Sequence, residues 1–154
     1  MGYIHIDFAE VWTDEGKLYL CVAIDRVSKC ACAELHERAT RRTAADFLRR
    51  LIAHVPYTIH TVLTDNGFQF TAPHGGWTVT EIQQLLASHQ RFRAHALDLA
   101  CAQHGIDHRL TTFTPPWTNG QVERMNRTIK DATVRRFFYA THERLRTHLA
   151  TFPI

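Results

Sequence analysis

A chain of 154 residues, 45% hydrophobic and 21% charged, has the composition of one soluble globular domain. It contains no apolar run of about 18 residues, and its first residues lack the basic and apolar segments of a signal peptide. A membrane partner is therefore not expected, and the net charge of +3 is too small to identify another partner by itself.

The first third of the chain predicts three strands joined by short connections. Apolar and polar residues alternate in the first strand, which places His5 and Asp7 on one face and the neighbouring isoleucines on the other. A turn sequence at 13–16 favours a tight hairpin. The connections are too short for crossovers, so we expect an antiparallel meander. The strands are predicted at residues 3–12, 17–25 and 29–35.

A helix is predicted next, from Thr40 to Val55, because apolar residues recur at helical spacing and Pro56 follows. Residues 58–64 are rich in β-branched side chains and predict a fourth strand. This strand runs into Asp65 and a turn-forming Asn-Gly pair. Since a helix separates it from the meander, we expect the fourth strand to lie parallel to a neighbour.

The second half predicts helices around one further strand. Residues 72–92 have the weakest pattern, and Gly105 is a typical helix stop. The predicted elements are a short helix at 80–89, a helix at 93–104, a strand at 106–113, a helix at 120–139 and a last helix capped by Thr141. The whole chain therefore predicts an α/β fold with a five-stranded mixed sheet, three antiparallel strands followed by two parallel ones, flanked by helices.

Three acidic side chains fall where these elements can meet. Asp7 lies within the first strand, Asp65 at the end of the fourth, and Glu123 in the first turn of a late helix. If the two strands are neighbours, both aspartates project from one edge of the sheet and the glutamate arrives from the helix beside it. Grouped carboxylates repel one another unless a cation is present, and Mg²⁺ and Mn²⁺ favour oxygen ligands. Two such ions can activate a water or a 3′-hydroxyl for in-line attack on phosphorus.

Each acid also has an ordinary structural interpretation. Asp7 can be an edge-strand acid, and Asp65 can simply begin a turn. Glu123 can be a first-turn glutamate stabilised by the helix dipole. Taken singly, these interpretations are favoured, and it is the combination of all three acids that favours a metal site.

The last quarter of the chain is basic. Between Arg124 and Arg146 there are seven Lys or Arg residues against two acids. Arg127 and Lys130 follow Glu123 by four and seven residues, so the three share one helix face. One acid beside two bases favours a metal site next to a polyanion such as DNA. A solvated basic helix face is the alternative.

The four cysteines predict a reducing compartment rather than a metal site. Three fall in strand-like runs and one in a helix-like run, as expected of buried thiols. A zinc site built with His104 would lack the usual paired spacing and is not expected. The cysteines are Cys21, Cys30, Cys32 and Cys101.

Over nearly its whole length, the chain resembles the catalytic cores of DDE transposases and retroviral integrases. It is most similar to bacterial insertion-sequence transposases of the integrase-core type. The matching motifs are Ile4-His5-Ile6-Asp7; Leu63-Thr64-Asp65-Asn66-Gly67 with Phe70; Cys101 to Gly105-Ile106 with His108; and Thr114-Pro115-Pro116-Trp117-Thr118-Asn119-Gly120-Gln121-Val122-Glu123-Arg124.

This resemblance implies an RNase H-like fold and a DNA transposase core that uses two Mg²⁺ or Mn²⁺ ions. Asp7, Asp65 and Glu123 would be both the catalytic residues and the metal ligands. The implied reactions are cleavage at the 3′ ends of the transposon and attack of the freed 3′-hydroxyl on target DNA. The implied DNA contacts are Arg127, Lys130, Asn119, Gln121 and Arg124.

The resemblance also implies a homodimer that handles two DNA ends, in the bacterial cytoplasm with the nucleoid. The core would be a single domain, 1–154, cut from a longer transposase whose preceding helix-turn-helix region recognises the ends. Asp65 and Glu123 are further apart than in many relatives, and residues 72–92 are the expected insertion. The alternatives are an RNase H-like nuclease that cuts without joining, and a non-catalytic remnant that binds DNA or self-associates.

Overall fold

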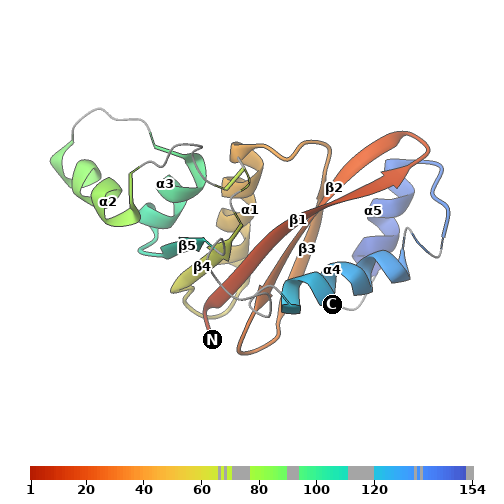
Figure 1. Ribbon diagram of the computed structural model, residues 1–154, viewed down its shortest axis with the longest axis horizontal. Helices are drawn as coiled ribbons and strands as arrows, with labels where there is room; N and C mark the ends of the chain where they lie inside the picture. The colour runs from red at the N-terminus through yellow and green to blue at the C-terminus, as the bar shows by residue number, and fades with distance from the viewer. Residues whose placement is uncertain are drawn as a thin grey trace.

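The computed structural model describes residues 1–65, 67, 69–70, 77–89, 94–110, 120–133, 135 and 137–151. Within these residues, one mixed sheet is accompanied by helices (Figure 1). The strands are β1 Tyr3–Thr13, β2 Gly16–Asp25, β3 Ala31–His36, β4 Thr61–Thr64 and β5 Asp107–Leu110. The helices are α1 Arg41–His54, α2 Val79–Ser88, α3 Ala96–Gln103, α4 Gly120–Ala132 and α5 His142–Thr151.

The sheet has the strand order β3-β2-β1-β4-β5. β1 pairs with β2 in antiparallel fashion over its whole length, and β2 pairs likewise with β3. β4 lies parallel to β1, and β5 lies parallel to β4. The predicted sheet, three antiparallel strands and two parallel ones, is therefore confirmed. β1 is the central strand, with a neighbour on each side.

Alternation along the strands divides the core into two layers, one on each face of the sheet. Ile4 and Ile6 of β1 pack in one cluster with Phe47 of α1 and Leu97 of α3. The opposite face packs against α4 and α5, through a cluster that comprises Val11, Leu18, Leu20, Val22, Ile24, Ala31, Val122, Ile129, Tyr139, Leu145 and Leu149. Each fully buried aliphatic side chain contributes about 1.5–3 kcal/mol, so these clusters hold the helices on their faces.

Gly2 fixes the start of β4 beside β1. The amides of His60 and Thr61 donate to the Gly2 carbonyl at 2.8 and 3.2 Å. Gly2 has a φ of +91°, and a Cβ there would lie 2.3 Å from the carbonyl oxygen of Thr58. Only glycine fits such a close approach. β4 begins at Thr61 rather than at 58 as predicted, because its pairing with β1 starts at Tyr3 and Thr61.

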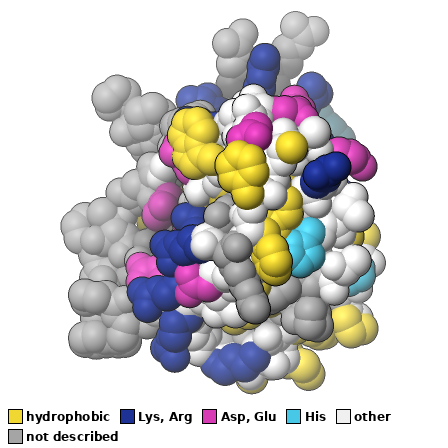
Figure 2. All heavy atoms as spheres, turned by 90° about the vertical axis from the view of Figure 1, so that its right-hand side faces the viewer, with side chains coloured by type: hydrophobic (Ala, Val, Ile, Leu, Met, Phe, Trp, Pro, Cys, Tyr) yellow, Lys and Arg dark blue, Asp and Glu magenta, His cyan; other side chains and the backbone are white. Residues whose placement is uncertain are grey.

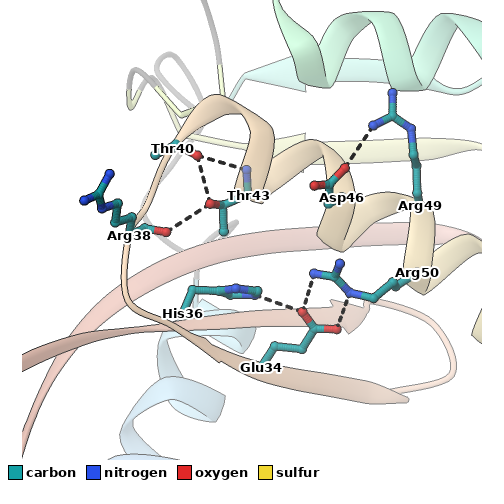
Figure 3. Close-up of polar contacts among 8 residues, drawn as sticks. All are labelled: Glu34, His36, Arg38, Thr40, Thr43, Asp46, Arg49 and Arg50. Carbon is teal, nitrogen blue, oxygen red and sulfur yellow. Dashed lines mark hydrogen bonds and ion pairs between the residues drawn. The ribbon is translucent and has the colours of Figure 1, made fainter. Parts of the chain in front are cut away.

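Helix α1 begins and ends as its sequence predicts. The Thr43 amide donates to the hydroxyl of the N-cap, Thr40, at 3.1 Å, and Val55 is the C-cap. An ion pair joins the helix to β3 (Figure 3). Arg50 donates to both carboxylate oxygens of Glu34 at 2.9 and 2.7 Å. Burial alone would raise the pKa of Glu34, but hydrogen bonds from His36 and Arg50 lower it to about 2.

Helix α2 lies inside residues 72–92. A capping box starts it, in which Thr78 and Glu81 exchange hydrogen bonds of 3.2 and 2.7 Å. Ile82 is fully buried, and α2 packs on α3 at the end of the molecule beyond β5 (Figure 1). That residues 72–92 are an insertion stays a prediction.

Helix α4 is shorter than predicted, because it ends at Ala132 instead of Tyr139. The Thr133 hydroxyl donates to the Ile129 carbonyl at 2.6 Å. The chain then turns so that Tyr139 enters the core beside α5, where its carbonyl accepts from the Asp14 amide at 3.0 Å. Burying this aromatic ring outweighs the local helical pattern.

The prediction of four buried thiols is wrong for Cys30. Cys21 and Cys101 are buried and Cys32 is half-buried, but Cys30 is exposed in the turn before β3. The buried carboxylate of Asp25 organises this turn by accepting from the Val27 and Ser28 amides. None of the helices in the described part of the chain is long and apolar enough to cross a membrane.

Candidate active site

The register between β1 and β4 brings the two aspartates together. Leu63 of β4 lies beside His5 of β1. Two residues further along each chain are Asp65 and Asp7, which therefore point to the same face of the sheet. This is the face on which α4 packs. The neighbouring strands that the sequence interpretation required are present.

Helix α4 supplies the third carboxylate. Val122 is 1% exposed in the second core cluster, which fixes the first turn of the helix against the sheet. Glu123 follows it and lines a cavity of about 90 Å³ together with Asp7, Asp65 and His5. The three acids predicted from the sequence therefore meet around one small cavity. Asp65 and Glu123 are exposed, so the cavity opens to solvent.

Electrostatic repulsion acts between the acids of this cavity. The pKa of Asp7 is raised to about 6, first by burial, then by the charge of Asp65 and, to a smaller degree, that of Glu123. Among the described residues that line the cavity, none is a lysine or an arginine. The negative charges therefore have no basic partner in the lining, and a cation would relieve their repulsion.

Asn126 is a site residue that the sequence interpretation missed. Its amide donates to Oδ2 of Asp7 at 2.9 Å, and the side chain is buried. Its Oδ1 atom has no hydrogen-bond partner among the described residues. The available signal was its spacing, because Asn126 lies three residues after Glu123 and hence one turn further along the same side of α4.

Asp65 combines a turn with a position in the site. Its Oδ1 accepts from the Gly67 amide at 2.8 Å, which is the geometry of an Asx turn. The turn fixes the carboxylate at the end of β4, where it faces Asp7. The structural and the functional interpretations of Asp65 are therefore compatible.

The donor set suits a hard divalent cation, although the side chains are not gathered around one point. The three carboxylates that line the cavity supply the oxygen ligands that Mg²⁺ and Mn²⁺ prefer. Among the described residues, no group of three His, Cys, Asp or Glu side chains is close enough to hold one ion. Carboxylates repel one another, and a bound cation would offset this repulsion.

The predicted DNA contacts lie around the same helix. Arg124 and Arg127 are exposed on α4, and Gln121 and Lys130 are half-buried there. Asn119 lies outside the described residues. Viewed from the α4–α5 end, the molecule carries several Lys and Arg side chains close together (Figure 2). Arg127 and Lys130 share α4 with Glu123, and their contact with DNA stays a prediction.

Comparison with known proteins identifies the family. The model of a family described as "Integrase core domain" matches residues 1–114, well over half of the chain. The chain belongs to the integrase core domain family. This is the polynucleotidyl-transfer type of core found in integrases and transposases. Asp7 and Asp65 lie inside the matched residues of this integrase core, whereas Glu123 lies beyond them.

One curated relative of the integrase core is "Uncharacterized protein K02A2.6" of Caenorhabditis elegans. It is 29% identical over 130 residues, which are 82% of this chain and 8% of that protein. The integrase core therefore spans a small part of the relative that it matches.

Two solved structures share the fold. The simian T-cell lymphotropic virus intasome in complex with PP2A regulatory subunit B56 gamma matches with a TM-score of 0.66 and 19% identity, over 99% of this chain and 44% of that chain. The catalytic core domain of BIV integrase matches with a TM-score of 0.59 and 23% identity, over 84% and 67% of the two chains. The mixed sheet flanked by helices is thus the RNase H-like fold of integrase catalytic cores.

Proposed function

We propose that this integrase core is the catalytic core of a DNA transposase of the insertion-sequence type. It performs divalent-metal-dependent phosphoryl transfer: cleavage at the 3′ ends of the element, then strand transfer into target DNA. The observation that carries the proposal is the cavity lined by Asp7, Asp65 and Glu123 in an integrase-type fold. Acids from three separate elements, β1, the end of β4 and α4, line it.

The three carboxylates share one role in this proposal. Asp7, Asp65 and Glu123 would hold two Mg²⁺ or Mn²⁺ ions, which would polarise the phosphate and lower the pKa of an attacking water or 3′-hydroxyl. The raised pKa of Asp7 allows this group to exchange a proton for a cation near neutral pH. Asn126 orients the Asp7 carboxylate through their hydrogen bond.

DNA is the proposed partner because the basic residues lie beside these acids on α4. Arg127 and Lys130 bind phosphates and position the strand, without reading its sequence. Arg124, Gln121 and Asn119 would add contacts at the start of the helix. Transposition joins two element ends to one target, so the proposal includes a homodimer. It also includes the bacterial cytoplasm, where the free thiols of the chain stay reduced.

The decisive experiment combines metal binding with strand chemistry. Electron paramagnetic resonance would measure Mn²⁺ binding to the protein. Nicking of supercoiled plasmid and joining of an oligonucleotide 3′-hydroxyl to it would measure chemistry. Asp65→Asn and Glu123→Gln should both reduce Mn²⁺ binding and bring cleavage to background, with unchanged circular dichroism. Glu143→Gln is the matched control, because Glu143 occupies the first turn of α5 as Glu123 does in α4.

The outcomes separate the rival functions. Nicking without joining of the 3′-hydroxyl would identify a nuclease. DNA binding without Mn²⁺ binding would identify a non-catalytic remnant. Activity of Asp65→Asn equal to that of the wild type would overturn the assignment of the site.

A further inference from the structure

A network of hydrogen bonds ends on the backbone of Asp65. The proposed chemistry gives no role to the side chains that form it. Nδ1 of His108 lies 2.6 Å from Oδ1 of Asp98. Nε2 of the same ring lies 2.7 Å from Oγ1 of Thr64, and this hydroxyl lies 3.2 Å from the carbonyl oxygen of Asp65. This hydrogen-bond network links α3, β5 and β4, and it ends on the backbone of a proposed metal ligand.

Burial decides whether this hydrogen-bond network can react with a substrate. A carboxylate, an imidazole and a hydroxyl in this order form the arrangement of a nucleophilic triad. However, Thr64 is 0% exposed and the His108 side chain only 4%, so the hydroxyl cannot reach a substrate. The hydrogen-bond network can therefore affect only the protein groups that it contacts. A buried polar network with satisfied hydrogen bonds makes its surroundings rigid.

The direction of the hydrogen bonds follows from their chemistry. The Asp98 carboxylate can only accept, so His108 donates to it from Nδ1. The Thr64 hydroxyl has one proton, and donating it to the Asp65 carbonyl leaves its oxygen to accept from Nε2 of His108. Asp98 therefore fixes the orientation of the ring, and the ring sets the orientation of the threonine side chain.

Backbone pairing alone holds the end of β4 weakly. The pairing of β4 with β1 covers residues 61–63 and stops before Thr64. Thr64 pairs only with Leu110 of β5, and β5 is itself only four residues long. Backbone pairing thus holds the last residue of β4 from one side. The hydrogen bonds from Asp98 to His108 and from His108 to Thr64 add side-chain contacts immediately before Asp65.

We propose that Asp98, His108 and Thr64 are positioning residues that fix the end of β4 and thereby aim the Asp65 carboxylate into the cavity. This inference rests on the proposed function of Asp65 as a metal ligand. The three residues act in the way that outer hydrogen-bond partners orient the ligands of metal sites. The sequence interpretation gave no role to His108 and did not single out Asp98.

The test compares closely related variants of the strand. Thr64→Val keeps the β-branched shape and removes the hydroxyl, and Thr64→Ser restores it. Thr61→Val makes the same change at the other end of β4 and serves as the matched control. Asp98→Ala removes the acceptor at the far end of the hydrogen-bond network, where the side chain is 15% exposed. Dissociation constants for MnCl₂ are measured by electron paramagnetic resonance, with unfolding midpoints with and without the ion.

We expect Thr64→Val and Asp98→Ala to weaken Mn²⁺ binding by about tenfold, as loss of outer partners does in metal sites. Thr64→Ser should recover most of the affinity, and Thr61→Val should match the wild type. A purely structural role would lower the midpoints of Thr64→Val and Asp98→Ala without changing the Mn²⁺ dissociation constant, and this result would overturn the proposal. If Thr64→Val does not fold, an unchanged constant in Asp98→Ala overturns it equally.

Asp65→Asn separates this inference from the proposed function. If Asp65→Asn loses Mn²⁺ binding while Thr64→Val and Asp98→Ala keep it, only the positioning role fails. If Asp65→Asn binds Mn²⁺ like the wild type, or the wild type does not bind it, the proposed function fails and the positioning role with it.

Discussion

The side-chain amide of Asn126 donates a 2.9 Å hydrogen bond to the carboxylate of Asp7, which joins α4 to the central strand of the sheet. Asn126 is 7% exposed, so the bond forms away from bulk water. It opposes the effects of burial and of the neighbouring acids, which raise the pKa of Asp7. The same bond fixes the helix that carries Glu123. One contact therefore links two of the three proposed metal ligands.

Removing this donor should affect both stability and metal binding. Asn126→Ala leaves the Asp7 carboxylate with one partner fewer, so we expect a loss of about 1–3 kcal/mol in the free energy of unfolding. The affinity for Mn²⁺ should fall by about tenfold. Urea unfolding and metal titration measure these changes. Thr128→Ala, a change on the exposed side of α4, should stay within about 0.5 kcal/mol. Equal effects of the two variants would refute the role of Asn126.

The raised pKa of Asp7 predicts that the metal-free protein is less stable at higher pH. Because the folded pKa of about 6 exceeds the ordinary 3.8, the folded state binds more protons than the unfolded state between these values. Stability should therefore fall as the pH rises from about 4 to about 6, by on the order of 3 kcal/mol. Asp7→Asn removes this cost, and should melt above the wild type at pH 8 in EDTA.

The same variant provides its own control at low pH. Near pH 4 the wild-type Asp7 is protonated and resembles asparagine in charge, so the two melting midpoints should converge. Parallel curves across the whole range would contradict a raised pKa. Mn²⁺ competes with the proton for Asp7, so binding to the wild type should weaken below about pH 6, whereas Asp7→Asn should bind weakly at every pH.

The basic face of α4 predicts a specific salt dependence of DNA binding. Arg127→Ala combined with Lys130→Ala removes two phosphate contacts, which should reduce the slope of log K against log salt by about 2. The matched control is Arg41→Ala combined with Arg42→Ala, because these exposed arginines belong to α1 on the opposite face of the sheet. Fluorescence anisotropy with a DNA duplex measures both. Equal slopes in the two double variants would indicate general charge attraction only.

The ion pair between Glu34 of β3 and Arg50 of α1 predicts a pH-dependent contribution to stability. Glu34 has a folded pKa of about 2 against the ordinary 4.5, so its stabilisation is present above about pH 4.5 and disappears as the pH falls toward 2. Arg50→Ala should cost about 1–2 kcal/mol at pH 7, because the pair is partly solvated, and less near pH 3. Arg49→Ala, which removes an exposed ion pair with Asp46, should cost under about 0.5 kcal/mol. A loss for Arg50→Ala that does not depend on pH would contradict the role of Glu34.

Local pattern was sufficient to predict most of the secondary structure. The alternation in β1, the turn before Gly16 and the cap at Thr40 depend on neighbouring residues, and the structure has each of them. The parallel direction of β4 was predicted from the helical crossover before it, whereas its place beside β1 came from the structure. The grouping of Asp7, Asp65 and Glu123 was predicted from their places at strand and helix ends, and all three line one cavity in the structure.

The sequence by itself determined the fold class and the places of the three acids along its elements, because strand alternation, helical spacing and turn chemistry are properties of nearby residues. Only the tertiary structure decided which other side chains support the acids. Asn126 meets Asp7 across 119 residues, and His108 meets Thr64 across 44. The end of α4 at Ala132 was likewise decided by the burial of Tyr139 against α5. Such contacts depend on burial and distance in space, which periodicity along the chain does not encode.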